Sequence, residues 1–103
     1  MILVSVFYPY QQGARFDVDY YLNKHMKHVH QCWDGMGLKM ARVLRGQPSP
    51  DGKPPVYEVM AHLGFESLDA FKAAVEAHGG EIFGDIPNFT DIKPETQISE
   101  ILA

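Results

Sequence analysis

The chain of 103 residues is long enough for one domain and leaves no room for a separate substrate or cofactor domain, so we expect a single domain over residues 1–103. Nine basic residues against 13 acidic ones give a net charge of −4 without a Lys/Arg-dense segment, which argues against a nucleic-acid partner, because such binding needs a basic face. The single Cys32 cannot form an internal disulfide, and the apolar run at residues 2–8 is too short to span a membrane, so we expect a cytoplasmic protein without membrane contact.

The first half of the chain predicts a strand, a helix and a second strand. Residues 2–8 are almost continuously apolar, as in a central strand, and Pro9 ends the run. Asp17 is a suitable N-cap for a helix, and Gly35 and Gly37 supply its end. One apolar stripe is expected along this helix, made of Leu22, Met26, Val29 and Trp33. Residues 38–45 alternate loosely and predict the second strand.

The second half predicts a strand, a helix and a last strand. Residues 46–55, with four prolines, form a turn-rich loop before a strand over 56–65, and the short connection indicates a hairpin. Ser67 is the expected cap of a helix that Gly79-Gly80 ends. Its inward side chains are expected to be Leu68, Phe71, Ala74 and Val75. A structured excursion with a short helical turn follows over 81–94, and residues 96–102 form the last strand.

This order is the ferredoxin-like βαββαβ pattern, an α+β fold with two helices on one face of a four-stranded antiparallel sheet. The face without helices is expected to be apolar as well, since the first and third strands alternate apolar side chains on both sides. These sets are Leu3, Ser5 and Phe7 against Ile2, Val4 and Val6, and Tyr57, Val59, Ala61 and Leu63 against Val56 and Met60. A large exposed apolar face is unfavourable, so we expect a homodimer whose two sheets enclose a small-molecule pocket.

Several segments together resemble the EthD family over nearly the whole chain. They are 16–26 (FDVDYYLNKHM), 37–46, 65–71 (FESLDAF), 84–91 (GDIPNFTD) and 97–100 (QISE). The resemblance implies a dimeric α/β-barrel of ferredoxin-like subunits, in agreement with the open-face argument. It implies function more weakly, since structural relatives include cofactor-free monooxygenases and cyclases. Lys27 stands where many similar sequences have Pro, so the helix is expected to continue through that position.

The strongest candidate catalytic residue is His25. At about 100° per residue, Tyr21, His25, His28 and Cys32 fall along one flank of the apolar stripe. An imidazole at an apolar boundary can transfer protons near neutral pH, and the resemblance indicates the same position. Packing of His25 against a carbonyl or a carboxylate is the structural alternative.

Further substrate-binding candidates come from the third strand and from the excursion after the second helix. Glu58 and His62 share a face that would line the space between two sheets, although a solvated face explains Glu58 equally well. Asp85 and Asn88 belong to a segment that could form a lid, a dimer contact or a structural cap. Together with Tyr21 and His28, these residues complete the predicted ligand site.

The sequence predicts neither a metal nor a cofactor. No glycine-rich phosphate loop, Ser-His-Asp order or metal-binding signature is present. A metal held by His25, His28 and Cys32 is a weaker interpretation. Haem bound through His25 or His62 is another.

Two functions remain open at this point. The first is a catabolic enzyme, an oxidoreductase of monooxygenase type or an isomerase, that acts without a cofactor on a small apolar or aromatic substrate with His25 as general acid or base. The second is a non-catalytic binding or accessory protein of a degradation pathway.

Overall fold

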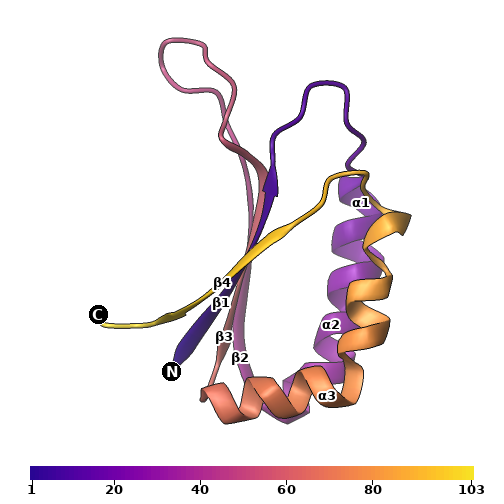
Figure 1. Ribbon diagram of the computed structural model, residues 1–103, viewed down its shortest axis with the longest axis vertical. Helices are drawn as coiled ribbons and strands as arrows, with labels where there is room; N and C mark the ends of the chain where they lie inside the picture. Colours follow the sequence, from indigo (N-terminus) through magenta and orange to yellow (C-terminus); the bar gives the residue numbers. More distant parts are fainter.

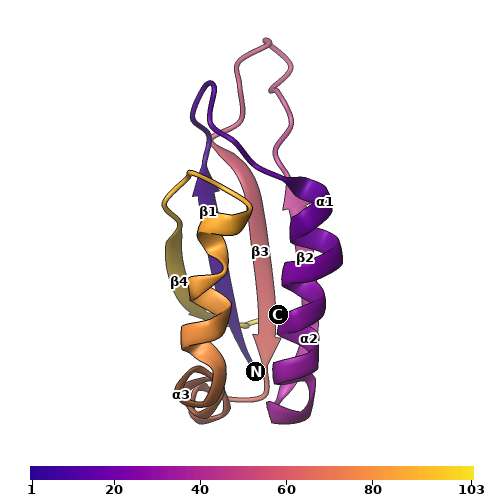
Figure 2. The same ribbon diagram turned by 90° about the vertical axis from the view of Figure 1, so that its right-hand side faces the viewer.

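One antiparallel sheet and one layer of helices make up the molecule (Figures 1 and 2). The computed structural model describes all residues 1–103. Its elements are β1 (Ile2–Pro9), α1 (Val18–Tyr20), a π-helical turn (Tyr21–His25), α2 (Met26–Trp33), a 3₁₀ turn (Asp34–Met36), β2 (Leu38–Arg45), β3 (Tyr57–Phe65), α3 (Leu68–Gly84), a second 3₁₀ turn (Ile86–Asn88) and β4 (Glu95–Glu100). The strand order β2-β3-β1-β4, with every pair antiparallel, confirms the ferredoxin-like fold. None of the helices combines the length and apolar character that a membrane span requires.

Three of the predicted helix boundaries, at Asp17, Ser67 and Gly37, are found in the structure. Asp17 accepts a hydrogen bond from the Tyr20 amide at 3.0 Å, and Ser67 accepts one from the Ala70 amide at 3.1 Å. Both satisfy amides that the first helical turn leaves without partners. Gly37 adopts φ = 97°, the left-handed conformation in which glycine ends helices at little cost. The connection that follows can therefore turn directly into β2.

The π-turn at Tyr21–His25 changes which side chains face the sheet. The Met26 amide bonds to the carbonyl of Tyr21, five residues back, instead of four. One extra residue rotates the preceding turn by about 100° relative to α2. Tyr21 is therefore 2% exposed, whereas Leu22, expected in the apolar stripe, is 46% exposed. The prediction for Leu22 was wrong because it assumed one regular helix, while Met26, Val29 and Trp33 are buried as expected.

The helix α3 continues past Gly79-Gly80, where the sequence predicted its end, and stops at Gly84. Neither glycine adopts a positive φ, so neither forms the left-handed cap assumed in that prediction. Figure 1 shows α3 bending sharply along its length, and a glycine pair is a known cause of helix bends. The bend directs the C-terminal half of α3 alongside α2. This direction places Asp85 near the π-turn.

The two faces of the sheet have different surroundings. Helices cover the face formed by Val4 and Tyr8 of β1 and by alternate residues of β3 (Val59, Ala61, Leu63 and Phe65). A bulge near Glu58 interrupts the pairing of β3 with β1. It turns Tyr57 to the open face, where its ring centroid lies 4.9 Å from that of Phe7, although simple alternation predicted Tyr57 on the helix-covered face.

The π-turn makes a prediction about stability. Met26→Ala should lower the free energy of unfolding by about 2–5 kcal/mol, because it removes buried apolar volume. Leu22→Ala should change it by about 0.5 kcal/mol or less, since Leu22 is on the surface. Urea unfolding of both variants at one protein concentration measures the difference. Equal losses would show that the helix is regular through residues 21–25.

Candidate active site

A cavity of about 110 Å³ lies between the helices and the sheet, and 14 of its 16 lining residues are hydrophobic. Its walls come from β1, β3, the π-turn, α2 and α3. Phe83 and Ile98 also line it and are 41% and 48% exposed, which places the opening between α3 and β4. Apolar cavities of about 150 Å³ bind benzene, so this one is of a size for a single small ring. This cavity lies within one chain, on the helix-covered side of the sheet, and the pocket expected between the sheets of two subunits stays a prediction.

His25 is the ionisable side chain in the cavity wall. It is 6% exposed, stacks on the Tyr21 ring at 5.3 Å between centroids and lies 4.7 Å from the Phe89 ring. Its Nδ1 is 2.9 Å from Oδ2 of Asp85, which does not line the cavity. Because Nδ1 is occupied by this bond, Nε2 is the nitrogen available to a molecule in the cavity.

Asp85, directly after α3, is held by three hydrogen bonds. Tyr20 Oη donates to its Oδ1 at 2.7 Å, Asn88 Nδ2 donates to the same oxygen at 2.8 Å, and His25 Nδ1 donates to Oδ2. Partial burial acts to raise the pKa of Asp85, but the bonds from Tyr20, Asn88 and His25 outweigh it and hold the pKa below its ordinary value. The carboxylate is thus ionised at neutral pH and fixes the orientation and tautomer of His25.

The imidazole of His25 is neutral at pH 7. Burial lowers its pKa, and the hydrogen bond and charge of Asp85 offset only part of this effect. Below a pH of about 6.5 an unfolded chain gains a proton on this histidine that the folded chain does not take up. Protonation of His25 therefore favours unfolding as the pH falls through that region. Above it, His25 is a neutral base with a free Nε2.

Besides His25, the cavity is lined by Thr96 and by two tyrosines, Tyr8 and Tyr21. Burial raises the pKa of Tyr8 far above its ordinary value, and the nearby Tyr21 raises it further. Burial also raises the pKa of Tyr21, although its interaction with Tyr8 lowers that pKa in part. Both hydroxyls stay protonated at any physiological pH. A protonated hydroxyl is a hydrogen-bond donor, and both tyrosines line the cavity.

Four of the predicted site residues come together in the structure. Tyr21 and His25 line the cavity, Asp85 holds His25, and Asn88 holds Asp85. Asp85 was expected to contact the ligand, but it contacts His25 instead. The structural alternative considered for His25, in which its ring packs against a carboxylate, is therefore what the structure shows. Because this contact uses Nδ1, it is compatible with a role for Nε2 in the cavity.

The other three predicted residues lie elsewhere. His62 is on the open face, where its Nδ1 pairs with Ser5 Oγ at 2.8 Å, and Glu58 lies on the same strand at the bulge. The whole sheet separates both from His25. His28 lies outside the cavity, between α2 and α3. The sequence does not show which face of the sheet borders this cavity, and a role of these three residues in binding a ligand stays a prediction.

Sequence reasoning did not identify Tyr8, Tyr20 and Phe89 as site residues. Tyr8 could have been found, since it continues the alternation that places Val4 on the helix-covered face. Tyr20 and Phe89 belong to segments that resemble the EthD family, but only the bend of α3 shows that they meet near Asp85. The sequence does contain the Gly79-Gly80 pair, but it was interpreted as the end of the helix and not as a bend.

The fold and this site define a ferredoxin-like protein with a buried histidine–aspartate pair at the wall of an apolar cavity. Comparison with solved structures shows 43% identity and a TM-score of 0.92 with an EthD-like protein from Ralstonia eutropha JMP134, covering 99% of this chain and 92% of that one. The chain therefore belongs to the EthD-like family.

More distant solved structures share the fold alone. An EthD family protein from Bacillus halodurans C-125 is 17% identical with a TM-score of 0.69, covering 99% of both chains. A dimeric ferredoxin-like protein from an uncultured marine organism is 12% identical with a TM-score of 0.55, covering 100% of this chain and 96% of that one. Neither the comparison with family models nor that with curated proteins gave a match.

The pair makes a prediction for the titration of His25. In Asp85→Asn the pKa of His25, measured by NMR, should fall below its wild-type value, because the charge that partly offsets burial is gone. Asp91→Asn removes a carboxylate near the same segment that pairs with Arg15, and should leave the His25 titration unchanged. A rise of the His25 pKa in Asp85→Asn, or no change, would contradict the assigned interaction.

Proposed function

We propose that this protein is a cofactor-independent enzyme that removes a proton from a small phenolic or enolisable aromatic substrate held in the cavity. The observation that carries this proposal is the buried His25, neutral and oriented by Asp85, in the wall of an otherwise apolar pocket. A general base of this kind needs a free nitrogen and an oriented ring, and both are present.

The chemistry follows from the groups in the cavity. Nε2 of His25 accepts the proton, and Asp85 stabilises the imidazolium that forms. The hydroxyls of Tyr8 and Tyr21 donate to the oxygen that gains negative charge. The resulting anion then either regains the proton at another carbon, which is isomerisation, or adds molecular oxygen. In the second case the hydroperoxide that forms at carbon loses water to leave a carbonyl, so the substrate supplies the electrons of this monooxygenation. Both outcomes fit a small catabolic enzyme.

One neighbour in structure is described as an enzyme of this general type. A protein from Shewanella loihica PV-4, described provisionally as a monooxygenase, has the same fold at 10% identity and a TM-score of 0.53, covering 99% of this chain and 94% of that one. Its low identity carries the fold alone. The proposal for this chain therefore depends on its own cavity and histidine.

We further propose that the protein is a cytoplasmic homodimer formed through the open faces of two sheets. The side chains of β1, β2 and β3 on that face include Leu3, Phe7, Leu44 and Met60, and no helix covers them. An apolar face of this kind is stabilised by a second copy on a two-fold axis. In that arrangement each subunit keeps its own cavity on the outer side of its sheet.

The proposed reaction is tested with His25→Gln. Oxygen uptake and product formation are measured with single-ring quinols and small lactones as substrates. We expect His25→Gln to lower kcat by about 100- to 10,000-fold, since proton transfer by a positioned side chain contributes that much. His30→Gln, an exposed histidine on α2 that pairs with Asp34, is the matched control and should keep wild-type turnover.

Two results would contradict an enzyme that uses His25. Unchanged turnover in His25→Gln would remove this residue from the chemistry. A compound that binds tightly in the cavity and emerges unaltered after long incubation would instead identify a binding or accessory protein.

The dimer is tested by sedimentation equilibrium. We expect wild-type protein to be dimeric and Phe7→Glu, which places a charge on the open face, to be monomeric at the same concentration. Leu22→Glu makes the same chemical change on the outer surface of the helical layer and should stay dimeric. A monomeric wild type, or a dimer in Phe7→Glu with native circular dichroism, would contradict the interface.

A further inference from the structure

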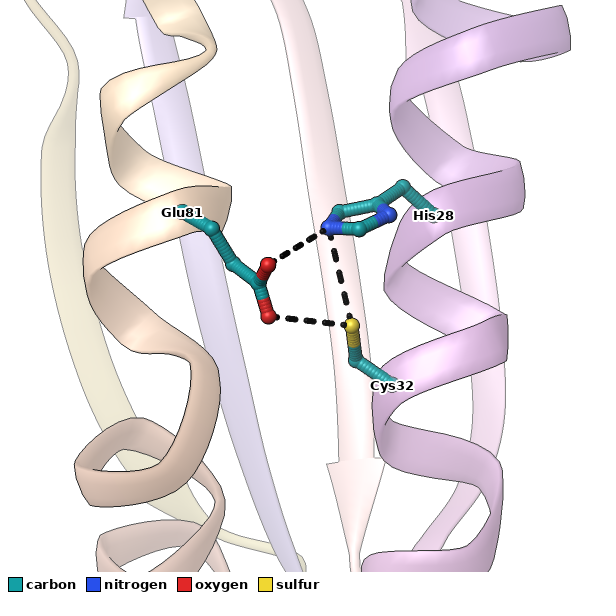
Figure 3. Close-up of side chains that lie close together, drawn as sticks. All are labelled: His28, Cys32 and Glu81. Carbon is teal, nitrogen blue, oxygen red and sulfur yellow. Dashed lines mark hydrogen bonds and ion pairs between the residues drawn. The ribbon is translucent and has the colours of Figure 1, made fainter.

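A second cluster of reactive side chains lies between α2 and α3, outside the cavity. Figure 3 shows His28 and Cys32 on α2 and Glu81 on α3 pointing toward one another. One ligand atom from each lies within 4.8 Å of the others. The proposed reaction uses none of these residues. The convergence of these three side chains is therefore not accounted for by the proposed reaction.

The distances in the cluster match the edges of a metal coordination tetrahedron. Cys32 Sγ is 3.6 Å from His28 Nε2 and 3.5 Å from Glu81 Oε1, and His28 Nε2 is 3.5 Å from Glu81 Oε2. Zinc bonds of about 2.3 Å to sulfur and about 2.0–2.2 Å to nitrogen or oxygen give tetrahedral edges of about 3.3–3.6 Å. The two contacts of Glu81 use different carboxylate oxygens. With one ligand atom from each residue, the three atoms lie within 4.8 Å of one another, so the Glu81 carboxylate has to turn for a single oxygen to complete both edges.

The donor types also indicate which ion fits. A thiolate, an imidazole and a carboxylate together suit Zn²⁺, whereas Mg²⁺ and Ca²⁺ prefer oxygen ligands alone. His78 Nδ1 pairs with Glu81 Oε1, the oxygen that also faces Cys32 Sγ, and so orients the carboxylate. This leaves the fourth position of the tetrahedron for water or a small anion.

The cluster is open to solvent. The side chains of His28 and Glu81 are 41% and 47% exposed. Both also line a shallow groove of about 280 Å³ together with Tyr20, Lys24 and Asp85. An ion can therefore enter from solvent without any rearrangement of the helices.

We propose that His28, Cys32 and Glu81 form a three-ligand Zn²⁺ site that ties α2 to α3. These two helices hold the candidate active site, since α2 follows His25 directly and α3 ends just before Asp85. Zn²⁺ binding stabilises this helix pair, because an ion that binds the folded chain alone adds to its stability. The site is separate from the cavity and does not depend on the proposed reaction.

The test uses the full-length, untagged protein, freed of metal and kept reduced, with Co²⁺ as a spectroscopic probe and Zn²⁺ as competitor. Wild type should bind one Co²⁺ per chain with a sulfur-to-cobalt charge-transfer band and visible bands of tetrahedral geometry. Zn²⁺ should displace the Co²⁺ and should raise the Tm.

Variants with native circular dichroism separate this site from adventitious binding. Cys32→Ser should lose the charge-transfer band. Cys32→Ser and Glu81→Gln should each weaken Zn²⁺ binding by more than the roughly 10- to 100-fold typical of residues that only orient a ligand, and His78→Gln should fall within that range. His30→Gln, on the same helix as His28, should bind as wild type does.

Two outcomes would overturn the site. One is a wild-type spectrum without a sulfur-to-cobalt band. The other is Zn²⁺ affinity in Cys32→Ser or Glu81→Gln equal to that of wild type, which would show that the three side chains form an ordinary hydrogen-bonded cluster.

Discussion

The hydrogen bond between His25 and Asp85 is the contact on which the rest of the site depends. A buried imidazole without a polar partner would be costly, so the fold must bring an acceptor to it. Asp85 can serve only because α3 bends and ends beside the π-turn. The carboxylate in turn depends on Tyr20 and Asn88 to keep its orientation and charge. Two irregular features, a π-turn and a bent helix, therefore produce one oriented base.

The two faces of the sheet have different proposed roles: one borders the cavity, and the other forms the dimer contact. Its helix-covered face forms a small apolar cavity with one histidine and two protonated tyrosines. Its open face carries apolar side chains beside the pair formed by Ser5 and His62. A dimer through the open face buries these groups without blocking the opening between α3 and β4. The proposed association and the proposed chemistry are thus compatible within one 103-residue chain.

The sequence allowed the order of elements to be predicted because local rules govern it. Alternation defined the strands, and Asp17, Ser67 and Gly37 marked helix boundaries through their own side chains or φ angles. The π-turn, the bulge near Glu58 and the bend of α3 escaped prediction, because each depends on tertiary packing more than on a local signal. For the same reason His25 and Asp85 were both identified as candidates, while their contact was not. Glu58 and His62 were grouped with them because sequence alone does not choose the face that borders a pocket.

The central claim is that the substrate lies between the helices and the sheet, with its acidic group at Nε2 of His25. A crystal structure of the protein with a small phenol bound tests this most directly. The account predicts density for the ring within the cavity and its oxygen within hydrogen-bonding distance of Nε2. Density for the phenol on the open face between two sheets, near His62, with an unoccupied cavity at His25, would contradict it.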